Sequence, residues 1–133
     1  MHWIALVVVL ALCEYMVFAF LVAGARGRYK IDAPAITRHP VFERTLRVQA
    51  NTLELLVVFV PALWLFGLFL DAPWGAGIGA AFVVGRALYA VGYITAPEKR
   101  GLGAGISFAA VGLLLLGALV GVLRMVFFVL KGG

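Results

Sequence analysis

The C-terminal part of the chain is almost entirely apolar: LGAGISFAAVGLLLLGALVGVLRMVFFVL at 102–130, in which Arg124 is the one charged residue. A helix needs about 20 apolar residues to cross the hydrocarbon core of a bilayer, so this stretch is long enough to span a membrane. Three comparable stretches precede it. We therefore predict four membrane spans, at 3–25, 42–70, 75–95 and 102–130.

The composition excludes a soluble protein. Apolar residues make up 65% of the chain and charged residues 13%, whereas a soluble domain has about 45–50% and about 25%. A globule of 133 residues cannot hide so much apolar surface. The single cysteine, Cys13, excludes an intrachain disulfide and a cysteine-based zinc site, and we expect no metal site. We predict an all-α integral membrane protein, a four-transmembrane-helix bundle that forms a single domain over 1–133.

The basic residues predict the orientation of the spans. They gather in the first connection, 26–41, and in the third, 95–101, whereas the second connection has none. The positive-inside rule places those two loops in the cytoplasm and both termini on the opposite side. The net charge of +5 therefore reflects topology, and we expect no nucleic-acid partner because there is no soluble basic surface. No Lys or Arg precedes the first span, so we do not expect it to be a cleaved signal peptide.

Glycines four residues apart recur in the third and fourth spans. The pairs are Gly75 and Gly79, Gly101 and Gly105, and Gly117 and Gly121. This spacing lets helices approach closely in lipid, and we expect the pairs at helix contacts. The alternative is that glycine is simply common in membrane helices.

Two of the predicted spans carry polar stripes. The second begins FERTLRVQANTLE at 42–54, and residues three or four apart there share one helical face: Arg44, Arg47, Asn51 and Glu54. Gln49 points elsewhere. The third span repeats this spacing with Arg86, Tyr89 and Tyr93. A charged group at the bilayer centre costs about 2.5–3.5 kcal/mol, so such stripes normally face a bundle interior or a wet cavity.

The stripes are compatible with two interpretations. In one, Arg44, Arg47 and Glu54 pair with one another and lock the bundle. In the other, the converging donors bind an anionic ligand through its carboxylates, and the glutamate meets the ammonium of the same ligand. Tyr89 and Tyr93 suit either the ligand or anchorage at the membrane interface.

Three blocks carry a resemblance to a known family: ARGRYKIDAP at 25–34, FERTLRVQANTLE at 42–54 and GRALYAVGYIT at 85–95, the last followed by Lys99 and Arg100. In order and spacing the chain resembles the MAPEG superfamily, the membrane-associated proteins of eicosanoid and glutathione metabolism. It looks most similar to the microsomal glutathione S-transferases of the third type, and next to the leukotriene synthase group. The resemblance implies a homotrimer that binds glutathione between neighbouring subunits near the cytosolic side.

The resemblance also implies roles for particular residues. The residues that would hold glutathione are Arg26, Arg47, Gln49, Asn51, Glu54, Arg86, Tyr89 and Tyr93. Glu54 would meet the γ-glutamyl ammonium, the arginines the carboxylates, and Arg100 the thiol. The implied activity is that of a glutathione transferase or peroxidase, in which the thiolate attacks a lipophilic electrophile or a lipid hydroperoxide supplied by the membrane lipid. A guanidinium beside the sulfur favours the thiolate, which is the nucleophile.

The chain departs from the leukotriene synthase pattern at two positions. Gly27 stands where that group has a second arginine, which Arg28 would have to replace, and Leu55 stands where the group has a tyrosine. Leukotriene synthesis is therefore doubtful. Two other functions stay open: a non-catalytic lipid-binding scaffold of the same family, and a small proton-coupled multidrug exporter that uses the intramembrane carboxylate Glu14.

Overall fold

The computed structural model describes residues 1–133, and its regular structure is entirely helical. Four long helices and one short 3-10 helix follow one another along the chain: α1 (His2–Tyr29), α2 (Pro40–Phe69), α3 (Ala72–Thr95), η1 (Pro97–Arg100) and α4 (Gly101–Leu130). All four long helices are apolar and long enough to cross a bilayer. The predicted fold class, an all-α bundle with four spans, is confirmed. The first helix continues past its predicted end at Ala25 to Tyr29.

Local sequence signals set where the helices start and stop. His39 caps α2, because its Nδ1 accepts a hydrogen bond of 3.2 Å from the Val41 backbone N–H. The Asp71 carboxylate caps α3 in the same way, through a bond of 2.8 Å from the Trp74 N–H. Helix α3 ends at Thr95, and the next residue, Ala96, is extended because a proline follows it. The connection between α2 and α3 is therefore only residues 70–71, and Ala96 alone separates α3 from η1. Such short connections keep neighbouring helices side by side.

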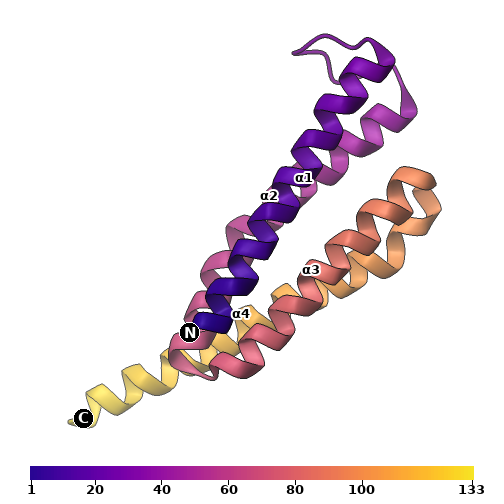
Figure 1. The fold of residues 1–133 in the computed structure, drawn as a ribbon. Helices are drawn as coiled ribbons and strands as arrows, with labels where there is room; N and C mark the ends of the chain where they lie inside the picture. The colour runs from indigo at the N-terminus through magenta and orange to yellow at the C-terminus, as the bar shows by residue number, and fades with distance from the viewer.

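The two basic connections lie at the same end of the bundle. Figure 1 shows both chain termini at one end, and the α1–α2 connection and η1 at the other. This arrangement agrees with the predicted up-and-down order of four spans, whereas the side of the membrane on which each end lies stays a prediction. The C-terminal part of α4 projects beyond the other helices (Figure 1), and residues 123–130 are exposed.

The core runs along the bundle axis and consists of apolar side chains from all four long helices. Phe59 on α2 and Phe82 on α3 stack with their ring centroids 3.9 Å apart, and both are fully buried. Large apolar residues also cover the outside, and Trp74 has 72% of its surface exposed. An exterior of this kind fits lipid or another subunit, so the protein is a multi-pass integral membrane protein.

Glycines allow close helix approach at two of the three predicted pairs. A Cβ atom would press on a neighbouring helix at each of four predicted positions: Gly75, Gly79, Gly117 and Gly121. The prediction for Gly101 and Gly105 is wrong, because both face open space. Gly103, between them, is the glycine that meets α3, and a Cβ atom there would overlap the backbone of Tyr89.

Candidate functional site

The candidate site is organised around the guanidinium of Arg86, which is fully buried between α2, α3 and α4. Its Nε donates to the Ser107 hydroxyl at 2.9 Å. Its Nη1 donates to Asn51 Oδ1 at 2.7 Å and to Thr52 Oγ1 at 3.3 Å. The Ser107 hydroxyl in turn donates to the Gly103 carbonyl at 2.7 Å. One arginine thereby joins three helices through a connected polar network.

The bond from Arg86 fixes which end of the Asn51 amide is free. Because Oδ1 accepts from the guanidinium, Nδ2 is left as a donor. Asn51 is only partly buried, and Arg47 and Glu54 are exposed beside it on the same face of α2. This face therefore presents a cation, an amide donor and a carboxylate to whatever lies outside the single chain.

The predicted pairing of Arg44 with Arg47 and Glu54 is not formed. Arg44 instead donates from Nε to the Ile94 carbonyl at 3.2 Å, which ties α2 to the end of α3. Arg47 and Glu54 stay exposed. The structure thus leaves these two charges available to a ligand.

Aromatic rings connect the buried network to the start of α4. The Arg86 Cζ lies 4.4 Å from the centroid of the Tyr89 ring. Tyr89 stacks on Tyr93 at 5.4 Å, and the Arg100 Cζ lies 5.9 Å from the Tyr93 ring. Arg100 is exposed and precedes α4, whose first turn has no side-chain cap. Helix α4 continues directly from η1, and the Arg100 guanidinium places a positive charge at this junction.

Two of the predicted site residues lie on the other side of α2. The Gln49 side chain points toward α1, with its Nε2 3.5 Å from the Tyr15 hydroxyl. Around the helix it is about 160° from Asn51. Arg26 donates from Nη1 to the Ala35 carbonyl at 2.7 Å, and its Cζ lies 4.9 Å from the Phe42 ring. A single chain therefore brings Arg47, Asn51, Glu54, Arg86, Tyr89, Tyr93 and Arg100 to one side and leaves Arg26 and Gln49 apart from them.

Of the two positions that depart from the leukotriene synthase pattern, Leu55 is packed in the core and Gly27 is not packed against any other residue. Leu55 is 8% exposed and belongs to the core. Gly27 faces open space. The Arg28 Cζ lies 5.5 Å from the ring of its neighbour Tyr29, so its side chain is directed along the surface of α1.

Sequence reasoning missed two members of the network, Thr52 and Ser107. Both are buried hydroxyls that accept from Arg86. A hydroxyl residue within an apolar span is itself a signal in the sequence, because a buried hydroxyl needs a hydrogen-bond partner. The sequence did not show that a helix so far along the chain would supply the partner of Arg86.

Four apolar helices around a buried cationic network define a polytopic membrane protein with a polar site at one end of the bundle. A model of the MAPEG family matches residues 4–120. The chain is 44% identical over 121 residues to an uncharacterized protein of Synechocystis sp., a match that covers 91% of this chain and 88% of that protein. It is 38% identical over 117 residues to human microsomal glutathione S-transferase 2, covering 87% of this chain and 80% of the human protein.

A shorter match, 31% identical over 83 residues, relates the chain to bovine leukotriene C4 synthase and covers 62% of this chain and 55% of the synthase. The chain belongs to the MAPEG family. The family predicted from the three sequence blocks is thus confirmed. Three of the matching relatives, from human, cow and mouse, are named microsomal glutathione S-transferase 2 rather than as the third type.

Proposed function

We propose that this chain is a membrane-bound glutathione transferase, with glutathione peroxidase chemistry available at the same site. The observation that carries the proposal is the continuous polar track from Asn51 through Arg86 to Arg100, open to the outside beside Arg47 and Glu54. Two of its matched relatives are named as a glutathione S-transferase and as leukotriene C4 synthase. A tripeptide with two carboxylates and one ammonium matches this mixture of charges.

In this proposal, each charged end of glutathione meets a group of opposite charge. Glu54 receives the γ-glutamyl ammonium, Arg47 pairs with a carboxylate, and the Asn51 Nδ2 donates to the same end. Arg86 has no exposed surface, so it acts through Asn51 rather than by touching the ligand. Tyr89 and Tyr93 lead from this end of the site to the thiol end.

Arg100 stabilises the glutathione thiolate. A free thiol of this type has a pKa near 8.5, so only a small fraction is ionised near neutral pH. A guanidinium beside the sulfur favours the charged form. Lowering the thiol pKa by two units would correspond to about 2.7 kcal/mol.

The activated sulfur has two chemical outcomes. Attack on an electrophilic carbon forms a C–S bond, and the displaced electron pair leaves with the departing group or moves onto the acceptor, where it is protonated. Attack on the terminal oxygen of a lipid hydroperoxide forms an S–O bond and breaks the O–O bond, which gives the alcohol and a glutathione sulfenic acid. A second glutathione then attacks the sulfenic sulfur, forms the disulfide and releases water. The membrane supplies the lipophilic acceptor and thereby raises its local concentration at the site.

The site is completed between the subunits of a homotrimer. Arg26 and Gln49 lie on the far side of α2 from Asn51, so a neighbouring chain contributes them. The exposed apolar surfaces of α1 and α4 provide faces for that contact and for lipid. By the positive-inside rule, the end that carries Arg100 is cytoplasmic, where it has access to glutathione.

The thiolate absorbance of bound glutathione in the ultraviolet tests the proposal, measured near neutral pH on protein purified in detergent. Arg100→Ala should remove the signal, whereas Lys99→Ala, an exposed basic neighbour in η1, should retain it. Glutathione that binds without ionising would favour the lipid-binding scaffold. Glutathione that does not bind at all would refute the transferase proposal.

A further inference from the structure

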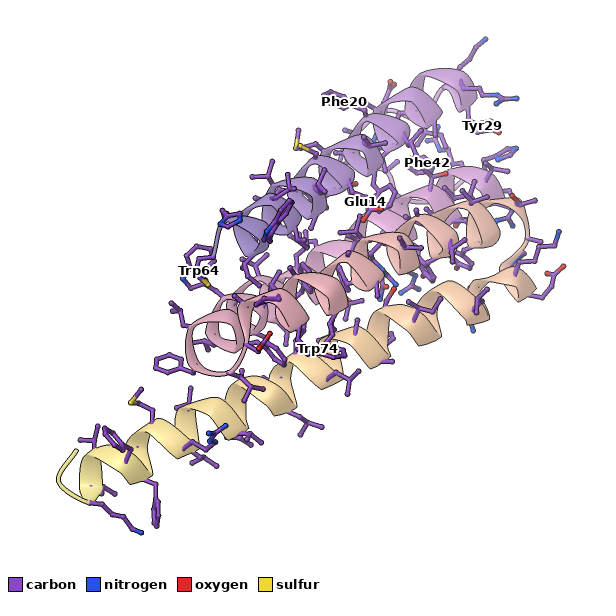
Figure 2. All side chains as sticks on the ribbon, turned by 60° about the horizontal axis from the view of Figure 1, so that its bottom comes forward. Glu14, Phe20, Tyr29, Phe42, Trp64 and Trp74 are labelled. Atoms are coloured by element: carbon purple, nitrogen blue, oxygen red, sulfur yellow. The ribbon has the colours of Figure 1, made fainter.

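Glu14 is the carboxylate that neither the core nor the proposed glutathione site uses. It lies on α1, and its Oε1 is buried without any hydrogen-bond partner. Figure 2 shows it directed from α1 into the space beside α3. There it lines an apolar groove of about 640 Å³ between these two helices. A carboxylate at membrane depth is costly unless an opposite charge balances it.

Arg86 shows the complementary imbalance. Its side chain is fully buried, and the three groups that accept its hydrogen bonds are all neutral. Its Nη2 has no partner. A buried guanidinium is strongly destabilised without a countercharge, even when neutral groups satisfy part of its hydrogen bonding.

The register of α1 against α3 brings these two groups to the same level. Toward the terminal end of the bundle, Val7 faces Gly79, where a Cβ atom would lie 2.8 Å from the valine Cγ1. Toward the other end, Phe18 belongs to the same buried cluster as Ala90. The carboxylate and the guanidinium lie between these two contacts, and neither the Glu14 Oε1 nor the Arg86 Nη2 has a hydrogen-bond partner.

We propose that Glu14 is the ionised counterion of Arg86 and, through Arg86, a positioning residue for glutathione binding. The second half of this statement rests on the proposed function. In a low-dielectric interior the attraction between two charges is strong without direct contact. A balanced guanidinium keeps its bond to the Asn51 Oδ1, which directs Nδ2 to the ligand. Without the Glu14 charge, the Arg86 guanidinium is drawn toward water or another anion and releases its hydrogen bond to Asn51.

A lipophilic amine in the α1–α3 groove is the competing explanation. The groove is lined mostly by apolar residues, and Glu14 is its charged member, so an ammonium with an apolar body would fit it. The structure favours Arg86 as the partner, because the buried guanidinium repels a second cation beside the same carboxylate.

Infrared spectroscopy in mildly alkaline buffer tests the counterion directly. The wild type should show an ionised carboxylate band that Glu14→Gln removes. In Arg86→Gln, a protonated carboxylic acid band should appear, and it should be absent from the Glu14→Gln, Arg86→Gln double variant. Val17→Gln, which puts the same amide in the same groove, should leave the band unchanged.

The proposal would be overturned if Glu14 is protonated in the wild type. It would also be overturned if the infrared band of the Glu14 carboxylate is unchanged in Arg86→Gln. Ionisation of Glu14 only when dodecylamine is added would identify an amine site instead. Melting temperatures in detergent give a second readout. Glu14→Gln should lower the melting temperature in the wild type but not in the Arg86→Gln background, and equal losses in both would contradict the pair.

Glutathione binding tests the positioning role. Glu14→Gln should raise the dissociation constant severalfold, Glu14→Asp should restore part of the affinity, and the thiolate fraction of the bound glutathione should stay the same. A lower thiolate fraction at unchanged affinity would overturn the positioning role. If the wild type binds no glutathione, the proposed function fails, while the infrared and melting results still decide whether Glu14 balances Arg86.

Discussion

Replacing Gly103 with alanine is expected to force α4 away from α3 at the level of the candidate site. A Cβ atom there would overlap the backbone nitrogen and Cα of Tyr89 and would lie 2.8 Å from the Gly85 carbonyl oxygen. Backbone atoms cannot rotate out of the way as a side chain can, so the helices themselves must move apart. Arg100 and Ser107 lie one turn before and one turn after Gly103 and would move with α4.

The size of the effect follows from two opposing contributions. Overpacking of this kind costs about 1–3 kcal/mol. Alanine in place of glycine at an unobstructed helical position instead gains up to about 1 kcal/mol. Gly105, two residues along the same helix, faces open space and provides the matched control. Both variants share that gain, so their free energies of unfolding should differ by the overpacking cost alone, about 1–3 kcal/mol.

Thermal melting in detergent and the glutathione thiolate signal together measure this effect. Gly103→Ala should melt well below the wild type and lose thiolate signal, because Arg100 and Ser107 are displaced. Gly105→Ala should melt at or above the wild-type temperature and keep the signal. Equal behaviour of the two variants would refute the close approach of α4 to α3.

Two further substitutions separate binding from stability. Arg26→Ala removes the bond to the Ala35 carbonyl, a charged hydrogen bond that stabilises by about 1.5–3 kcal/mol. Limited proteolysis should cut the α1–α2 connection faster in this variant than in the Arg28→Ala control, and equal cutting would contradict the tether. Asn51→Asp keeps an acceptor for Arg86 but loses the amide donor. Calorimetric titration should show weaker glutathione binding at an unchanged or raised melting temperature, whereas unchanged affinity would remove Asn51 from the site.

Hydropathy and helical spacing predicted the features that depend on near neighbours in the chain. The number of helices and their apolar character follow from the length of each apolar run. The shared face of Arg47 and Glu54, and the divergence of Gln49 from it, follow from 100° of rotation per residue. These features needed no knowledge of how the helices pack.

The remaining features depend on how each helix is rotated about its own axis. The spacing of glycines in α4 predicts a helix contact at Gly105, whereas Gly103 is the glycine that faces α3. The burial of Arg86 likewise depends on Ser107, which reaches it only because that glycine lets the helices touch. Hydropathy along a single chain contains no information on such a rotation, because both faces of α4 are apolar.

A structure of the protein solved with glutathione bound would show whether the residues around Arg86 and Arg100 form the glutathione site. We expect the sulfur beside the Arg100 guanidinium, the ammonium beside Glu54, and the Asn51 Nδ2 donating to a carboxylate. We also expect the Arg26 side chain of a neighbouring subunit to complete the site. Glutathione bound with its sulfur away from Arg100, or no bound glutathione at saturating concentration, would contradict the proposed site.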